Sequence, residues 1–279
     1  MKIAENPAAG KMDCRPATLA GMFYPGNAEE LKSLLDALFS STVTSVTPLY
    51  GVLVPHAGYL YSGKTAACAY ARIPETFSGT FIVIGPSHAG CMTATADLIW
   101  ETDLGPVMPD RKLVAAFEKA GIPNRPDMMC IQENSLEVQM PLIHYRFPNA
   151  KIAPILLGDQ SLSAVCRVAA AISQAIDQTG GVRPVIIASS DGSHYVPAKT
   201  AKHDDLIVLA AAAELDVAKF YEVLWKVQPS MCGYGCIATM LLIGRHLGAT
   251  KAKLILYQTS GNTTGDNREV VSYAAMEVV

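Results

Sequence analysis

Three histidines of this 279-residue chain follow short apolar runs, at positions where buried strands would end. His56 follows the run GVLVP, His88 follows FIVIGPS, and His194 follows VIIASSDGS, which also carries Asp191. Imidazole is a common ligand of transition metals and also an acid or base near neutral pH. Three imidazoles that converge in space would therefore form a metal site or an acid–base site.

Two histidines and one anionic side chain are a frequent ligand set for Fe, Zn or Cu. The residues alone leave four anionic candidates: Asp191, Glu133, Glu137 and Cys232. Cys232, in MCGYGC, lies just before an apolar helical run, where the helix dipole is expected to lower the pKa of its thiol. Three further histidines fall in helical stretches and are expected to be helix-surface residues: His144, His203 and His246.

The elements that must position these residues alternate along the chain. Apolar, β-rich runs predict strands near residues 49–55, 79–85, 151–158, 183–190, 251–260 and 269–279. Helical patterns fall between them, near residues 28–39, 62–73, 110–121, 133–147, 161–181, 199–227 and 235–249. Such alternation favours an α/β fold with a mixed, largely parallel central sheet and helices on both faces. Ligands bind at the carboxyl ends of strands in these sheets, so the histidine loops are expected to meet there.

Local signals refine this scheme. Asn27 is a suitable N-cap, and Glu30 completes a capping-box pattern before a run of leucines. Pro141 is expected to disturb the helix at 133–147. The glycine-rich stretch at 260–267 lacks the lysine of a phosphate-binding loop and is expected to be a turn at the sheet rim. Residues 1–279 are interpreted as one domain, with 1–14 as a flexible or extended segment.

Composition limits the function classes. A net charge of −3 without a dense Lys/Arg stripe disfavours nucleic acid as a partner. No run approaches the roughly 20 apolar residues of a membrane helix, and the first 13 residues lack the apolar core of a signal peptide. Seven scattered cysteines favour free thiols in a reducing compartment, so a cytoplasmic location is predicted. The mean hydropathy of +0.24 indicates a large core and could include a homo-oligomer interface.

Several ordered motifs together resemble the Memo family, the system protein B members of the AmmeMemoRadiSam group. They include RPATLAGMFYPG, VPHAGYLYSG, IGPSHAG, ENSLEVQMPL, SSDGSHY, CGYG and TSGNTTGD, and they run from Arg15 to the C-terminus. The family is similar in fold to LigB-like class III extradiol dioxygenases, which are non-haem iron enzymes. The group label implies an AMMECR-type protein and a radical SAM protein as partners.

The resemblance also implies roles for single residues. Its metal ligands correspond to His56, His88 and Cys232, which would bind one transition metal ion (Fe, Cu or Zn). Asp191 and His194 correspond to residues beside that site, where a dioxygenase histidine acts as acid or base. Cysteine replaces the carboxylate of the dioxygenase ligand set, which shifts the preference toward Zn or Cu(I). Family members often carry histidine where this chain has Asn134, and asparagine cannot act as a general base.

Three function hypotheses follow. In the first, a non-haem metal-dependent oxidoreductase holds one metal and His194, oriented by Asp191, moves a proton. In the second, which follows the resemblance to animal Memo proteins, a non-catalytic protein binds a phosphopeptide or another anion, or handles metal. In the third, Cys232 is a nucleophile assisted by His194 and Asp191. The substrate of the first, an unknown small molecule, is not defined by the sequence.

Overall fold

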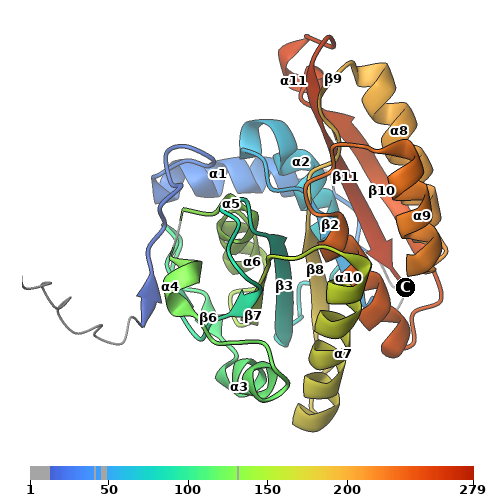
Figure 1. Cartoon of the computed structure of the whole chain (residues 1–279). Coiled ribbons are helices and arrows are strands. Elements are labelled where there is room, and N and C mark those ends of the chain that lie inside the picture. Colours follow the sequence, from blue (N-terminus) through green and yellow to red (C-terminus); the bar gives the residue numbers. More distant parts are fainter. Residues whose placement is uncertain (1–12, 41, 45–48, 131) are drawn as a thin grey trace, which may run out of the picture.

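A computed structural model describes residues 13–40, 42–44, 49–130 and 132–279. Its main sheet has the strand order β10-β11-β2-β8-β3-β7-β4, with β6 beside β7 and β9 beside β11 (Figure 1). The strands of this sheet are β2 (Gly51–Val54), β3 (Thr80–Pro86), β4 (Ala94–Thr95), β6 (Met108–Pro109), β7 (Lys151–Leu157), β8 (Val185–Ser189), β9 (His194–Val196), β10 (Ala252–Thr259) and β11 (Val270–Val278). A separate pair joins β1 (Cys14–Arg15) to β5 (Ile99–Trp100).

Strands β2, β8, β3 and β7 are parallel neighbours in the centre of the sheet. Strands β10, β11 and β4 pair in antiparallel fashion toward its two edges. The sheet is therefore mixed with a parallel centre, and the predicted fold class is confirmed.

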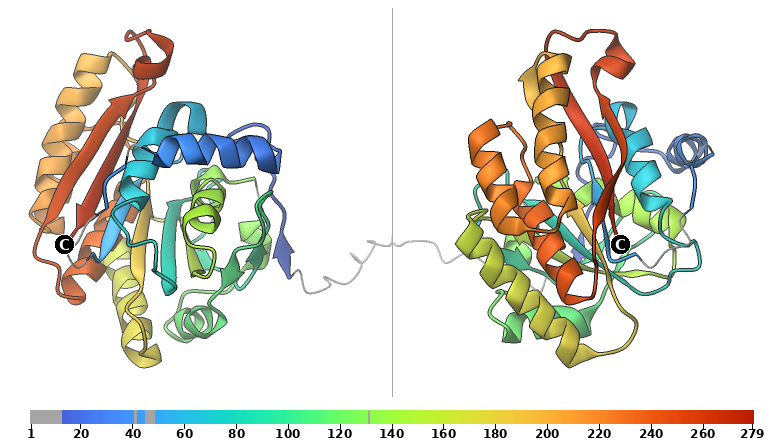
Figure 2. Two further views of the ribbon diagram at one scale, coloured as in Figure 1. Left: turned by 180° about the vertical axis from the view of Figure 1, so that it is seen from behind. Right: turned by 90° about the vertical axis from the view of Figure 1, so that its right-hand side faces the viewer.

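Helices cover both faces of this sheet. On one face lie α1 (Ala28–Phe39), α2 (Tyr59–Tyr70), α4 (Pro126–Met129), α5 (Asn134–Glu137) and α6 (Gln139–Arg146), all of which contribute to one apolar cluster. The opposite cluster takes side chains from α3 (Arg111–Lys119), α7 (Leu162–Thr179), α8 (Ala198–Ala213), α9 (Val217–Val227) and α10 (Tyr234–His246). Figure 2 shows α1 and α2 on one side of the sheet and α7 to α10 on the other.

Side-chain alternation along the strands explains why both faces are apolar. In β2, Val52 and Val54 belong to the cluster under α1 and α2, whereas Leu53 belongs to the cluster under α10. In β3, Phe81 belongs to the cluster under α1 and α2, and Ile82 belongs to the cluster under α10. Successive side chains of a strand point to opposite faces, so a strand covered on both sides is apolar throughout.

The predicted start of α1 is found in the structure. The Asn27 side chain accepts hydrogen bonds from the backbone N–H groups of Glu29 and Glu30, at 2.9 and 3.2 Å. Leu31 and Leu35 are then fully buried in the apolar cluster that also contains residues of α2.

The helix predicted at 133–147 is divided into two helices, α5 and α6, which meet at Val138. Pro141 lies in the first turn of α6. A continuous helix would need the N–H of residue 141 to bond the carbonyl of Glu137, and proline has no N–H. The stretch at 260–267 contains one short helical turn, α11 (Gly261–Thr264), between β10 and β11. Within the described ranges, no helix is both long and apolar enough to cross a bilayer.

The chain near its start is anchored by a buried ion pair. Residues 1–12 of the predicted flexible or extended segment lie outside the described residues, and Cys14 begins β1. Arg15 pairs with Glu137 of α5, and both side chains are 1% exposed. The same carboxylate accepts hydrogen bonds from Leu19 N–H at 2.6 Å and Tyr24 O–H at 3.0 Å. This pair fixes α5, whose N-cap is Glu133.

Replacing Glu137 by alanine should therefore lower the free energy of unfolding by about 3–5 kcal/mol, because Arg15 would stay buried without its partner. Denaturant unfolding measures this change. The control is Glu214→Ala, whose ion pair with Lys219 is exposed and should contribute nothing measurable. Equal stability of the two variants would show that the Arg15–Glu137 pair does not anchor this segment.

Candidate metal centre

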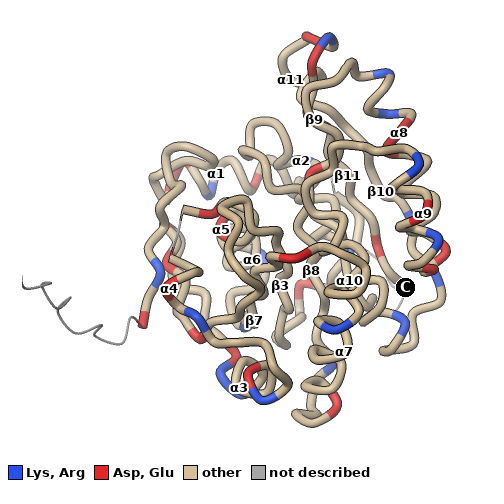
Figure 3. Tube along the Cα trace, viewed as in Figure 1, with Lys and Arg blue, Asp and Glu red and all other residues tan. Residues whose placement is uncertain are grey.

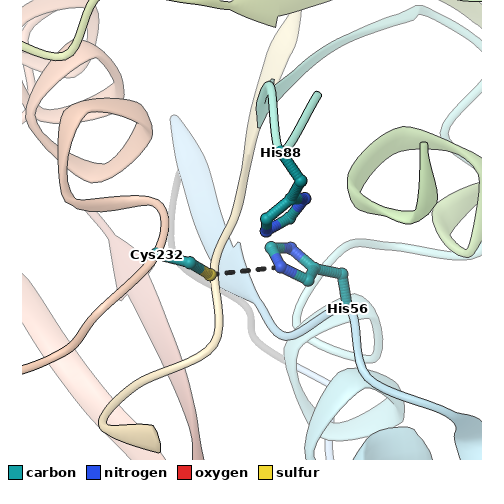
Figure 4. Close-up of side chains that lie close together, drawn as sticks. All are labelled: His56, His88 and Cys232. Carbon is teal, nitrogen blue, oxygen red and sulfur yellow. Dashed lines mark hydrogen bonds between the residues drawn. The ribbon is translucent and has the colours of Figure 1, made fainter. Parts of the chain in front are cut away.

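Three side chains from distant loops meet at the carboxyl end of the parallel strands (Figure 4). His56 follows β2, His88 follows β3, and Cys232 precedes α10. Both β2 and β3 pair with β8, which lies between them, so their exit loops emerge side by side. The ligand atoms offered by the three side chains all lie within 4.8 Å of one another. The predicted convergence of these three residues is therefore found in the structure.

The two imidazoles stand nearly perpendicular, with ring centroids 5.3 Å apart and an interplanar angle of 83°. The Sγ atom of Cys232 is 3.2 Å from Nε2 of His56. His56 is buried, whereas the His88 side chain is 43% exposed. The group is thus closed on the protein side and reaches solvent beside His88.

The tautomer of His56 is fixed by Ser189 at the end of β8. The Ser189 hydroxyl donates its only proton to the carbonyl of Ser135, at 2.5 Å. Its oxygen must then accept the bonds from His56 Nδ1, at 2.9 Å, and from the Gln139 amide, at 3.0 Å. His56 therefore carries its proton on Nδ1 and turns the lone pair of Nε2 toward Cys232. Burial lowers the pKa of His56, which keeps the ring in its neutral, metal-binding form.

The carboxylate of Glu133 holds the proton of His88 on Nδ1. Its Oε1 accepts from Nδ1 of His88 and its Oε2 accepts from the backbone N–H of that residue, both at 2.7 Å. Burial by itself would raise the pKa of Glu133, but the hydrogen bonds from His88 and from Ser135 N–H lower it overall. The same hydrogen bond raises the pKa of His88. A carboxylate on the remote nitrogen orients an imidazole and strengthens it as a ligand through Nε2.

The prediction that the helix dipole lowers the pKa of the Cys232 thiol is wrong. Cys232 does lie just before the first turn of α10, but burial and the nearby Asp191 carboxylate raise the pKa of the thiol to about 12. Desolvation of a thiolate therefore outweighs the dipole here. In the metal-free protein the thiol keeps its proton and can donate it to Nε2 of His56.

His194, the third histidine expected to converge, is not part of the ligand group, and the partners of Asp191 and His194 differ from those in the first hypothesis. The Asp191 carboxylate accepts the backbone N–H of His56 at 2.8 Å, and it lies 4.0 Å from Nε2 of that ring. His194 is held instead by Ser230, whose hydroxyl accepts the His194 N–H and whose carbonyl is 3.0 Å from Nδ1. Ser230, not Asp191, orients His194.

The remaining acidic candidates serve other partners. Glu137 binds Arg15 and Glu133 binds His88, so neither occupies the ligand group. Asn134 donates from its amide to the carbonyl of His56 at 3.1 Å and so supports that loop.

The three helical histidines lie outside the group. The His144 ring bonds the carbonyl of Pro106, and His246 bonds Asp177 on the surface. His203 is exposed on α8, as expected from its helical position.

Sequence reasoning missed the polar residues that set the tautomer of His56. Ser189 lies 133 positions from His56, and Gln139 lies 50 positions from Ser189. No spacing rule connects such residues. The only local signal is that polar Ser189 and Ser190 end an otherwise apolar strand, which marks the end of the strand but names no partner.

Comparisons with known proteins show the family of the chain and agree with its fold. A family model described as Memo-like protein matches residues 15–277. A "MEMO1 family protein" of Methanosarcina acetivorans is 37% identical over 270 residues, covering 96% of this chain and all of the relative. One from Archaeoglobus fulgidus is 39% identical over 266 residues, covering 94% and 98%. The chain therefore belongs to the Memo-like family.

A solved structure, of an uncharacterized protein from Escherichia coli K12, is similar with a TM-score of 0.50 at 9% sequence identity. The similarity covers 81% of this chain and 99% of that chain. At this identity it supports the α/β fold alone.

The raised thiol pKa predicts slow alkylation of Cys232 in the metal-free protein at pH 7. Because the thiolate is the reactive form, the rate should rise about tenfold per pH unit up to pH 10. Exposed Cys166 of α7 is the internal control and should react faster at pH 7. Peptide mass spectrometry with iodoacetamide measures both sites. Faster labelling of Cys232 than of Cys166 at pH 7 would contradict the raised pKa and support a nucleophilic role.

Proposed function

We propose that this protein is a non-haem metalloenzyme whose single transition metal ion is bound by His56, His88 and Cys232. The observation that carries the proposal is the meeting of these three donor atoms within 4.8 Å. The hydrogen bonds of both Nδ1 atoms strengthen it, because they orient the two rings so that Nε2 is the nitrogen available to a metal.

The donor set fits a transition metal ion. Two neutral imidazoles and one thiolate suit Zn, Cu(I) or Fe(II), while a hard cation such as Mg²⁺ prefers oxygen ligands. A metal would replace the proton that Cys232 holds in its absence, so the high thiol pKa is compatible with binding. When bound, such an ion supplies Lewis-acid chemistry or, for Fe or Cu, redox chemistry.

His194 is the proposed acid–base residue. Its Nδ1 donates to the Ser230 carbonyl, which leaves Nε2 as a lone pair in a half-exposed ring. His194 follows the end of β8, the strand between β2 and β3, by five residues. Asp191 is proposed to hold the His56 loop through its backbone N–H. The related dioxygenase-like fold supports an oxidoreductase as the enzyme class, with a thiolate in place of the usual carboxylate ligand.

The surroundings of the site favour a cation over a phosphopeptide or another anion. The carboxylates of Glu133 and Asp191 hydrogen-bond the two ligand histidines or their backbone, and both are buried. A buried negative charge repels a phosphate group. In Figure 3 the Lys and Arg positions of the described chain are scattered singly or in small groups over the outer helices and loops. Anion binding is therefore the weaker candidate.

Two further parts of the proposal concern the cell. Seven scattered cysteines support a cytoplasmic, reducing location. AMMECR-type and radical SAM proteins are proposed as companions because the motifs resemble the AmmeMemoRadiSam group.

Metal titration of tag-free protein tests the site. Wild-type protein should bind one equivalent of Co²⁺ with a sulfur-to-metal charge-transfer band in the near-ultraviolet. His56→Ala, His88→Ala and Cys232→Ser should each lose more affinity than the about 10–100-fold caused by loss of an outer hydrogen-bond partner. His194→Ala should keep both the band and the affinity. Sub-stoichiometric metal, together with phosphate binding that survives chelators, would favour the anion-binding alternative.

Dioxygen uptake by the Fe(II)-loaded protein, screened with catechols as substrates, tests the enzyme class. Any uptake found should fall at least about 100-fold in His194→Ala, because general acid–base catalysis contributes roughly 10²–10⁴-fold. Full activity of that variant would show that His194 is not the acid–base residue.

A further inference from the structure

A glutamine side chain from another part of the fold makes two hydrogen bonds to the loop that carries Cys232. Gln160 lies between β7 and α7. Its Nε2 donates to the carbonyl of Cys232 at 2.8 Å, and its Oε1 accepts the N–H of Gly235 at 2.8 Å. One planar amide thus joins both ends of the segment Cys232–Gly235.

Close packing keeps this amide in place. A Cβ atom on Gly235 would lie 2.8 to 3.0 Å from Gln160 Cβ, Cγ and Oε1, so glycine is needed for the side chain to fit. The backbone carbonyl of Gln160 accepts the Tyr221 hydroxyl at 2.6 Å, which ties the glutamine to α9. The position of Gln160 therefore also depends on a contact outside the cysteine loop.

The opposite side of the loop rests on the end of β8. The Ser190 hydroxyl accepts the N–H of Gly233 at 2.9 Å and donates to the carbonyl of Asp191 at 2.8 Å. A Cβ on Gly233 would lie 2.6 Å from the Ser189 carbonyl and from Ser190 Cβ, so the loop touches the strand directly. Ser190 and Gln160 thus hold the loop from two different parts of the fold.

We propose that Gln160 is a positioning residue for the metal centre, which sets where the Cys232 sulfur lies relative to the two imidazoles. The inference rests on the proposed metal site. Each histidine lies two residues after a strand of the sheet, whereas Cys232 lies in the loop between α9 and α10. Its sulfur therefore needs separate support to stay within bonding reach. The amide of Gln160 has both a donor for the Cys232 carbonyl and an acceptor for the Gly235 N–H, so one side chain makes both hydrogen bonds.

The test compares Gln160→Glu and Gln160→Met with wild type by Co²⁺ titration of the full chain. Glutamate keeps the acceptor for Gly235 but places a carboxylate against the Cys232 carbonyl, and methionine removes both hydrogen bonds at similar length. We expect both variants to lose about 10–100-fold in Co²⁺ affinity and most of the sulfur-to-metal band, while the ligand-field bands from the histidines persist. The matched control is Gln174→Glu on the exposed face of α7, which should change neither quantity.

The outcomes separate the two proposals. Wild-type protein that binds no Co²⁺, or binds it without a sulfur band, would overturn the metal site itself. A normal wild-type band that is unchanged in both Gln160 variants would overturn the role of Gln160 alone. Circular dichroism and thermal unfolding of the metal-free variants complete the test. If both variants lose native structure without metal, Gln160 supports the fold rather than the ligand, and the proposal is wrong.

Discussion

Parallel pairing of β2 and β3 with the strand between them is the constraint on which the candidate site depends. Leu53 of β2 and Ile84 of β3 both pair with Ala188 of β8, so the two strands leave the sheet at the same level. His56 and His88 follow within a few residues of those positions. Because both strands are buried on both faces, a slip of one residue would exchange the side chains that fill the two apolar clusters, so close packing in both clusters favours the observed register.

Hydrogen bonds to the two imidazoles then determine which ring nitrogen can bind a metal. Two imidazoles close together could equally share a proton or bind water. Here Ser189 and Glu133 each engage an Nδ1 atom, which keeps the proton on Nδ1 and leaves Nε2 as the atom that can bind a metal. Ser189 can act in this way only because its own proton goes to the Ser135 carbonyl. The arrangement thus depends on groups from β8 and α5 as much as on the ligands themselves.

The sequence predicted the scaffold and the histidine part of the site well, because both follow from local patterns. Apolar runs that end in a proline-containing turn identified His56 and His88, and capping residues located α1. Short strands such as β4 and β5 were missed because two residues show no periodicity. The expected low pKa of Cys232 was wrong because burial and the Asp191 carboxylate are properties of the tertiary structure. Among four anionic candidates, the residues alone could not select Cys232; the family resemblance did so.

A crystal structure of metal-loaded, tag-free protein with anomalous data at the Fe, Cu and Zn edges tests the central claim most directly. The account predicts one anomalous peak in contact with Nε2 of His56, Nε2 of His88 and Sγ of Cys232, with a metal–sulfur distance of about 2.3 Å if the ion is Zn. A fully occupied metal bound elsewhere, or one that the Cys232 sulfur does not contact, would contradict it.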